Sequence, residues 1–129
     1  MSGPAVLQSV TPILLVTDVP ACAAFFRQYL GFDVDFLHGT PPFYGAVSRD
    51  GVCLHMRHVD QPVFAQAAAQ EESLILATIQ VSDVHALFDE FAARGLNFTQ
   101  PLVKQPWGGT DFHVSDLDGN VISFVTYES

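Results

Sequence analysis

The sequence predicts an α+β fold built from two tandem β-α-β-β-β modules, whose strands form a curved mixed sheet around a cavity. Two repeated signals predict it. Val16-Thr17-Asp18-Val19 returns as Val81-Ser82-Asp83-Val84, and the turn Asp50-Gly51 returns as Asp118-Gly119, with almost the same spacing. A repeat of this length that occurs only twice indicates two paired modules, because solenoids are built from shorter and more numerous units.

The first module spans about residues 8–59. Residues 10–17 are β-branched and apolar and predict a buried strand, after which Asp18 predicts a helix N-cap. Apolar residues then recur at helical spacing until Gly31, a typical helix end. Three further strands are predicted at residues 32–38, 43–49 and 52–59, separated by the turn of residues 39–42 and the hairpin Asp50-Gly51.

The second module, about residues 73–127, repeats this order after an Ala- and Gln-rich linker at residues 60–72, which has room for a short helix. A strand is predicted at 73–81, followed by a helix that is capped by Ser82 or Asp83 and ends at Gly95. The remaining strands are predicted at 97–103, 110–115 and 121–125. Asp118-Gly119 predicts a two-residue hairpin between the last two strands, because an Asp-Gly pair readily adopts the positive φ angles of such a turn.

The composition bounds the organisation and the partners of the protein. A chain of 129 residues with 49% apolar content fits one domain over residues 1–129. The net charge of −9 opposes binding to nucleic acids and favours cationic ligands. Cys22 and Cys53 are too few and too far apart for a disulfide framework, so we expect reduced thiols. We also expect a cytoplasmic protein without a membrane partner, since the sequence shows neither a signal-peptide pattern nor a long apolar run.

Trp107 stands out because it lies in a glycine loop, outside any periodic segment. It follows Pro106 and precedes Gly108-Gly109. A tryptophan in such a loop either folds back over the edge of the core or serves a ligand site. The next residues alternate, which places Asp111, His113 and Ser115 on one face of a strand and Phe112 on the other.

The paired modules resemble the vicinal oxygen chelate superfamily, which includes glyoxalase I, extradiol dioxygenases, and fosfomycin- and bleomycin-resistance proteins. The bleomycin-resistance type is the most similar. The resemblance rests on the segments Pro12–Val19, Phe25-Phe26, Leu30-Gly31-Phe32, the Phe43 strand, Gln105-Pro106-Trp107-Gly108 and the Asp-x-x-Gly-Asn turn at residues 116–120. The chain departs from that type at Thr110-Asp111, where an Arg-Glu pair is common, and at Leu117, where the turn commonly has proline.

The superfamily's enzymes place metal ligands at four equivalent strand positions, two in each module. The resemblance places these positions near Thr11 and Leu76 and on His55 and Ser123. A catalytic divalent cation usually needs about three His or carboxylate ligands, and His55 alone qualifies. We therefore expect no metal and no other cofactor, although His113 and Asp111 carry the atoms needed to replace missing ligands.

The resemblance also implies a ligand groove between the two subunits of a domain-swapped homodimer, with flat rings stacked on Phe43 and Trp107. His55 lies on one strand face with Arg57, which either pairs with Asp111 or Asp35 or reaches solvent. The predicted ligand-binding residues are Asp35, Phe36, Phe43, His55, Arg57, Trp107, Asp111 and Ser123.

These observations predict a metal-free protein that sequesters a small aromatic or cationic molecule, with a bleomycin-like antibiotic as the named candidate and no catalytic residue. The alternative is a metal-dependent lyase, isomerase or dioxygenase that uses His55. A third hypothesis is a binding protein for an endogenous metabolite.

Overall fold

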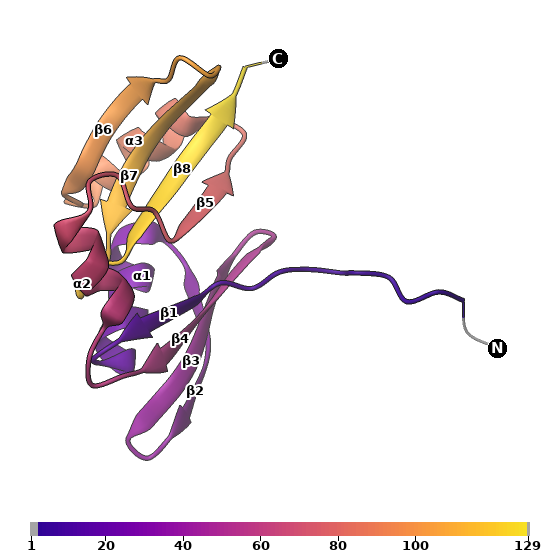
Figure 1. Ribbon diagram of the computed structural model, residues 1–129, viewed down its shortest axis with the longest axis vertical. Coiled ribbons are helices and arrows are strands. Elements are labelled where there is room, and N and C mark those ends of the chain that lie inside the picture. The colour runs from indigo at the N-terminus through magenta and orange to yellow at the C-terminus, as the bar shows by residue number, and fades with distance from the viewer. Residues whose placement is uncertain (1–2, 129) are drawn as a thin grey trace.

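The computed structural model describes residues 3–128 and confirms the α+β fold (Figure 1). Two four-stranded mixed sheets have the strand orders β1-β4-β3-β2 and β5-β8-β7-β6. The elements in chain order are β1 (Ile13–Val16), α1 (Val19–Leu30), β2 (Asp33–Gly39), β3 (Pro42–Arg49), β4 (Val52–His58), α2 (Val63–Gln70), β5 (Ala77–Gln80), α3 (Val84–Ala93), β6 (Phe98–Lys104), β7 (Gly109–Ser115) and β8 (Val121–Tyr127).

The two long helices begin in the same way, as the repeat predicts. Asp18 accepts a hydrogen bond from the Ala21 backbone N–H at 3.0 Å, and Asp83 accepts one from Ala86 at 3.0 Å. Helix α1 ends at Gly31, whose φ of 69° lies in the left-handed region that favours glycine. The N-cap predictions are therefore confirmed in both modules.

The first strand of each module is shorter than predicted. Residues 10–12 and 73–76 lie outside β1 and β5. Val10 is 90% exposed, because none of the strands within residues 3–128 pairs with it, and Pro12 has no N–H to donate to a ladder. The linker contains the short helix α2, as the sequence permitted.

One hydrophobic core extends across both modules. Its first part lies between α1 and the first sheet, and its second part lies between α3 and the second sheet. In the second part Phe91 packs edge-on against Phe112 and Phe124, with ring centroids 5.8 and 5.4 Å apart. Each sheet thus buries one face and turns the other away from its long helix.

The β7–β8 turn is longer than the predicted two-residue hairpin. Ser115 still pairs with Val121, so residues 116–120 form the loop. The Asp116 carboxylate shapes it by accepting hydrogen bonds from the backbone N–H groups of residues 118, 119 and 120 at 2.8–3.0 Å. Burial raises the pKa of Asp116, and the hydrogen bonds that the N–H groups of Asn120 and Gly119 donate to its carboxylate oppose that rise.

This loop also joins the second module to the first. The Thr17 hydroxyl donates to Asp118 at 2.8 Å, and the Asn120 side-chain amide donates to the Leu15 carbonyl at 3.1 Å. Both bonds link residues more than 100 positions apart in the chain. The β7–β8 loop therefore helps to set the position of the second module against β1.

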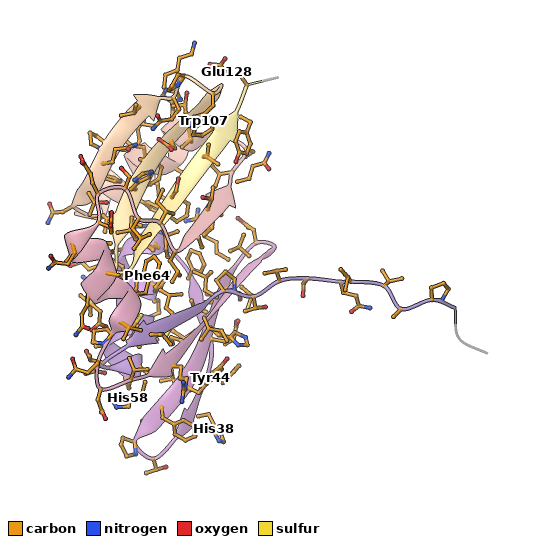
Figure 2. The ribbon with its side chains drawn as sticks, in the orientation of Figure 1. His38, Tyr44, His58, Phe64, Trp107 and Glu128 are labelled. Atoms are coloured by element: carbon orange, nitrogen blue, oxygen red, sulfur yellow. The ribbon has the colours of Figure 1, made fainter. Side chains whose placement is uncertain are left out.

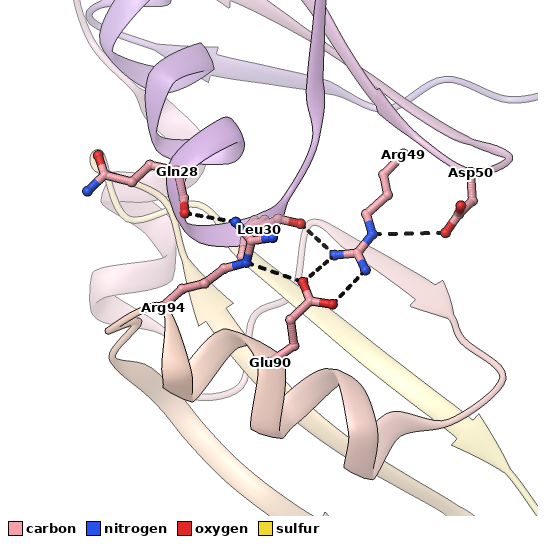
Figure 3. Close-up of polar contacts among 6 residues, drawn as sticks. All are labelled: Gln28, Leu30, Arg49, Asp50, Glu90 and Arg94. Carbon is pink, nitrogen blue, oxygen red and sulfur yellow. Dashed lines mark hydrogen bonds and ion pairs between the residues drawn. The ribbon is translucent and has the colours of Figure 1, made fainter.

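A second junction is built on Glu90 of α3 (Figure 3). Arg49 donates two hydrogen bonds to the Glu90 carboxylate, at 2.7 and 2.8 Å, and a third to the Leu30 carbonyl at 2.8 Å. Arg94 adds an ion pair with Glu90 at 3.3 Å and a bond to the Gln28 carbonyl. The two arginines thus satisfy carbonyl groups at the end of α1, which have no partner within the helix.

Candidate functional site

The predicted ligand residues lie mainly on the two sheet faces that point away from the long helices. Leu54 and Met56 of β4 are buried in the core, so His55 and Arg57 project from the opposite side. We call that side the module 1 face. In the second sheet Phe112 and Phe124 pack against α3, so Asp111 and Ser123 project from the other side, the module 2 face.

Three rings form a cluster on the module 1 face. The Tyr44 hydroxyl and His55 Nδ1 share a hydrogen bond of 2.9 Å. The Phe36 ring lies nearly parallel to Tyr44, with centroids 6.4 Å apart, and edge-on to His55 at 6.0 Å. Phe36 remains 45% exposed, so the cluster offers an accessible aromatic surface. The predicted site contained Phe36 and His55 but not Tyr44. Tyr44 could have been included because it pairs with Arg57, a predicted site residue, in the adjacent strand.

The other predicted residues of the first module lie around this cluster. Asp35 is exposed and accepts a hydrogen bond from the Ser48 hydroxyl at 2.8 Å. Arg57 reaches solvent and forms no ion pair with any other described residue, which answers the question that the sequence left open. Phe43 is 52% exposed and packs edge-on against His38, at the far end of β3.

Trp107 lies on the module 2 face, directly over Gly109. A Cβ atom at position 109 would collide with the indole ring and would also lie 3.0 Å from Val125 Cγ2. Tyr127 packs against the indole in a tilted arrangement, with ring centroids 5.8 Å apart. The ring stays 58% exposed, so Trp107 is a surface platform at the rim of the face and not a plug in the core.

Beside Trp107, the module 2 face holds a buried polar cluster centred on Asp111. Asp111 Oδ1 accepts hydrogen bonds from the side-chain amides of Gln100, at 2.8 Å, and Gln105, at 3.0 Å. His113 Nε2 lies 3.5 Å from Asp111 Oδ2 and has no hydrogen-bond partner among the described residues. Ser123 pairs with His113 in the sheet register and is also buried.

The sequence predicted His113 only as a replacement metal ligand, and neither glutamine was predicted as a site residue. The signal for His113 was present, because it alternates onto the same face as Asp111. Gln105 also organises the loop of Trp107: its backbone N–H donates to the Gly109 carbonyl at 2.7 Å and its carbonyl accepts from Gly108. The loop that presents the indole is therefore tied to the buried carboxylate.

A single chain does not bring Trp107 near the aromatic residues of the first module. Figure 2 shows Trp107 at one end of the molecule, near Glu128, and Tyr44 and His38 at the opposite end. The Phe43 ring packs against that same His38. The predicted stacking of one ligand between Phe43 and Trp107 therefore requires a second subunit.

The family follows from the sequence comparison. A family profile described as "Glyoxalase/Bleomycin resistance protein/Dioxygenase superfamily" matches residues 7–124. The chain belongs to this superfamily. Comparison with curated proteins gives no match. No helix in residues 3–128 is both long enough and apolar enough to cross a membrane.

Several solved structures share the fold over nearly the whole chain. A bleomycin-binding protein from Streptomyces verticillus, complexed with copper(II)-bleomycin, has a TM-score of 0.77 and 28% identity and covers 97% of this chain and 100% of its own. TioX from Micromonospora sp. ML1 has a TM-score of 0.72 and 22% identity, with 94% and 99% covered. A glyoxalase-related enzyme from Clostridium phytofermentans has a TM-score of 0.76 and 17% identity, with 96% and 98% covered.

The strand register shows what lies opposite the two predicted last-strand metal positions. Ile13 lies opposite His55, and Thr78 lies opposite Ser123. The predicted first-strand positions, Thr11 and Leu76, lie two residues before these register partners. None of these four first-strand residues supplies an imidazole or a carboxylate, so one histidine and Ser123 do not fit a divalent metal centre of the superfamily. Residues 3–128 also contain no group of three or more His, Cys, Asp or Glu side chains able to hold a metal ion.

Proposed function

We propose that this protein binds and sequesters a small molecule with an aromatic and/or cationic part, of the bleomycin class of antibiotics, in the cytoplasm. The module 2 face carries the proposal: the half-exposed Trp107 ring lies on the same sheet face as the buried Asp111 carboxylate, which Gln100 and Gln105 hold in place. The similarity to a bleomycin-binding protein over almost the full chain supports it.

Each part of this face suits one part of such a ligand. The flat, exposed indole offers a stacking surface for a planar heteroaromatic ring and an attractive face for a cation. Asp111 supplies a carboxylate beside the indole, and no Lys or Arg of the described residues lies within ion-pair distance of it. The net charge of −9 draws cationic ligands toward the protein over a longer range.

The binding unit in this proposal is a domain-swapped homodimer. The module 1 face of one subunit opposes the module 2 face of the other, which brings the Phe36, Tyr44 and His55 cluster across from Trp107. The separation of these residues within one chain supports this arrangement (Figure 2). The ligand groove would contain Asp35, Phe36, Phe43, Tyr44, His55, Arg57, Trp107, Asp111, His113 and Ser123.

Replacement of Trp107 by alanine tests the proposal. Calorimetric titration with metal-free bleomycin should show saturable binding to the wild type and a loss of roughly 1–3 kcal/mol of binding free energy in Trp107→Ala, from lost stacking and buried area. The variant should keep most of its folding stability, because the ring is 58% exposed. As a control, Leu117→Ala removes a similarly exposed apolar side chain from the β7–β8 loop and should bind normally.

Trp107 is the only tryptophan in the chain, so its emission gives an independent readout. Titration with metal-free bleomycin should change the intensity or wavelength of that emission. Unchanged, blue-shifted emission, together with a strongly destabilised Trp107→Ala variant, would show that the ring is a structural plug and would refute the site.

The competing proposal is a metal-dependent lyase, isomerase or dioxygenase that uses His55. The similarity in fold to a glyoxalase-related enzyme motivates it, whereas the residues at the other three metal positions oppose it. Elemental analysis of protein purified without chelators separates the two proposals. A stoichiometric divalent metal that is lost in His55→Ala would favour the enzyme.

A further inference from the structure

Four of the five lysine and arginine side chains of this protein have an evident role in the fold. Two arginines hold the Glu90 junction, and Lys104 pairs with Glu128 at 3.1 Å. Arg27 lies in the last turn of α1, where the helix dipole favours a cation. The fifth, Arg57, forms no ion pair with any other residue in 3–128. The chain has 14 acidic residues, so this reflects the position of Arg57 and not a shortage of carboxylates.

Arg57 lies beside the aromatic cluster on the module 1 face. In the register of the first sheet it pairs with Tyr44 of β3 and with Leu15 of β1. His55 projects from the same face two residues earlier in β4, so the two Cα atoms are about 7 Å apart. The register partners of His55 are an alanine and an isoleucine. Both side chains thus have uncharged neighbours on the adjacent strands, where a hydrogen bond to a ligand is stronger than in open water.

The acidic side chains of the first sheet lie away from this pair. Strands β1, β3 and β4 contain none, and β2 contains Asp33 and Asp35. Asp33 pairs with Ser48 in the sheet register, and Asp35 accepts a hydrogen bond from the Ser48 hydroxyl. Ser48 in turn lies opposite Cys53, four residues before Arg57, which is about 13 Å along the strand. The sheet therefore supplies no carboxylate at the Arg57 end of the face.

We propose that His55 and Arg57 form an oxyanion subsite, which binds a carboxylate carried on an aromatic ring. The Tyr44 hydroxyl donates its 2.9 Å hydrogen bond to His55 Nδ1, so the imidazole proton lies on Nε2. His55 Nε2 and the guanidinium, which has only donors, then each donate to one carboxylate oxygen. The ring of the ligand packs on Phe36, which is 45% exposed.

This inference rests on the proposed function, because it treats the module 1 face as one wall of the ligand site. It deepens that function by naming a further chemical group on the ligand. The donors of His55 and Arg57 call for an acidic group, whereas Asp111 on the module 2 face calls for a cationic one. A neutral carbonyl oxygen uses the same donors more weakly, since hydrogen bonds between charged groups are the stronger ones. The preferred ligand is therefore an aromatic molecule with both an acidic and a cationic end.

Calorimetric titration with 2-naphthoate and with uncharged 2-naphthamide tests the subsite. The two probes share the ring system and differ in the charged group, so the ratio of their affinities isolates the carboxylate. We expect the wild type to bind naphthoate about fivefold to tenfold more tightly. Arg57→Gln should bring the ratio to about one and leave the affinity for naphthamide unchanged. Arg27→Gln removes the same charge from another exposed arginine, so it is the matched control and should keep the ratio.

His55→Phe keeps a ring at this position but removes the donor, so it should also lower the ratio while circular dichroism shows an intact fold. The subsite would be overturned if naphthoate showed no saturable binding at millimolar concentration. Equal affinities of the wild type for the two probes, or a ratio that survives Arg57→Gln, would have the same meaning. Light scattering of Arg57→Gln gives a further check: a change in its oligomeric mass would show that Arg57 pairs with a second copy and would refute the subsite.

Metal-free bleomycin separates a failure of the subsite from a failure of the proposed function. A wild-type probe ratio near one, together with bleomycin binding that is weakened by Trp107→Ala, would refute the subsite alone. A clear probe ratio that Arg57→Gln abolishes, without any bleomycin binding, would refute the proposed drug class and support the subsite.

Discussion

The two sheets share one topology, yet their outward faces differ in both chemistry and exposure. On the module 1 face, Phe36, Tyr44 and His55 form an accessible aromatic cluster. On the module 2 face, Asp111 and His113 are buried and polar. Strand alternation explains how this is achieved: inward side chains are fixed by packing against the helices, whereas outward side chains are free to diverge. The repeat thus preserves a scaffold and not a site.

The largest expected difference between the faces concerns their carboxylates. Asp111→Ala should lower the free energy of unfolding by about 2–3 kcal/mol, because two half-buried glutamine amides lose their acceptor on a buried carboxylate. Asp35→Ala removes one hydrogen bond from an exposed carboxylate and should cost no more than about 0.5 kcal/mol. Urea unfolding monitored by circular dichroism measures both variants.

Asp111→Asn serves as the control for this pair, since it keeps one oxygen acceptor and should recover part of the loss. Equal costs for Asp111→Ala and Asp35→Ala would mean that the two faces do not differ in burial as described.

A smaller effect is expected at the hydroxyl of Tyr44. Tyr44→Phe removes the hydrogen bond to His55 Nδ1 and should cost about 0.5–1.5 kcal/mol of stability. Tyr127→Phe makes the same change beside Trp107, where packing of the ring is the observed contact, and should be nearly neutral. Thermal unfolding distinguishes them, and a neutral Tyr44→Phe would argue against a hydrogen-bonded cluster on the module 1 face.

The smallest effect concerns the junction between the modules and depends on pH. The hydrogen bonds from Arg49, opposed by burial and aided by the charges of Arg49 and Arg94, lower the pKa of Glu90. A lowered carboxyl pKa stabilises the folded state above the ordinary glutamate value of about 4.3, and this contribution is lost as pH falls through the folded pKa. Glu90→Gln should therefore cost about 0.5–1 kcal/mol at pH 7.

Melting temperatures of the wild type and Glu90→Gln, measured between pH 3 and 8, test whether the stability that Glu90 contributes is lost on acidification. The two curves should be parallel above pH 5 and converge in the acid range. A difference that grows on acidification would show that the ion pair does not supply the stability.

Local signals in the sequence were sufficient for most of the secondary structure. Asp18 and Asp83 predicted both long helices, because capping depends on residues that are close in the chain. The β7–β8 turn was predicted too short because Asp116 acts through three backbone bonds that the Asp-Gly signal does not reveal. Contacts between distant segments, such as Arg49 with Glu90, leave no local signal at all.

Strand alternation predicted which side chains of the candidate site share a sheet face, but it did not predict which of them lie close together in space. Alternation correctly grouped His55 with Arg57, and it could have added His113 to Asp111. It could not show that Trp107 and Phe43 lie at opposite ends of one chain, because that distance depends on how the modules are arranged.

The indole of Trp107 occupies the space that any side chain at position 109 would need. The residues allowed at positions 107 and 109 therefore depend on each other during evolution. Replacement of Gly109 requires the indole to move or to be lost first, after which the new side chain still meets Val125 Cγ2. Substitutions along this rim should then occur in a fixed order, with the ring lost before the glycine.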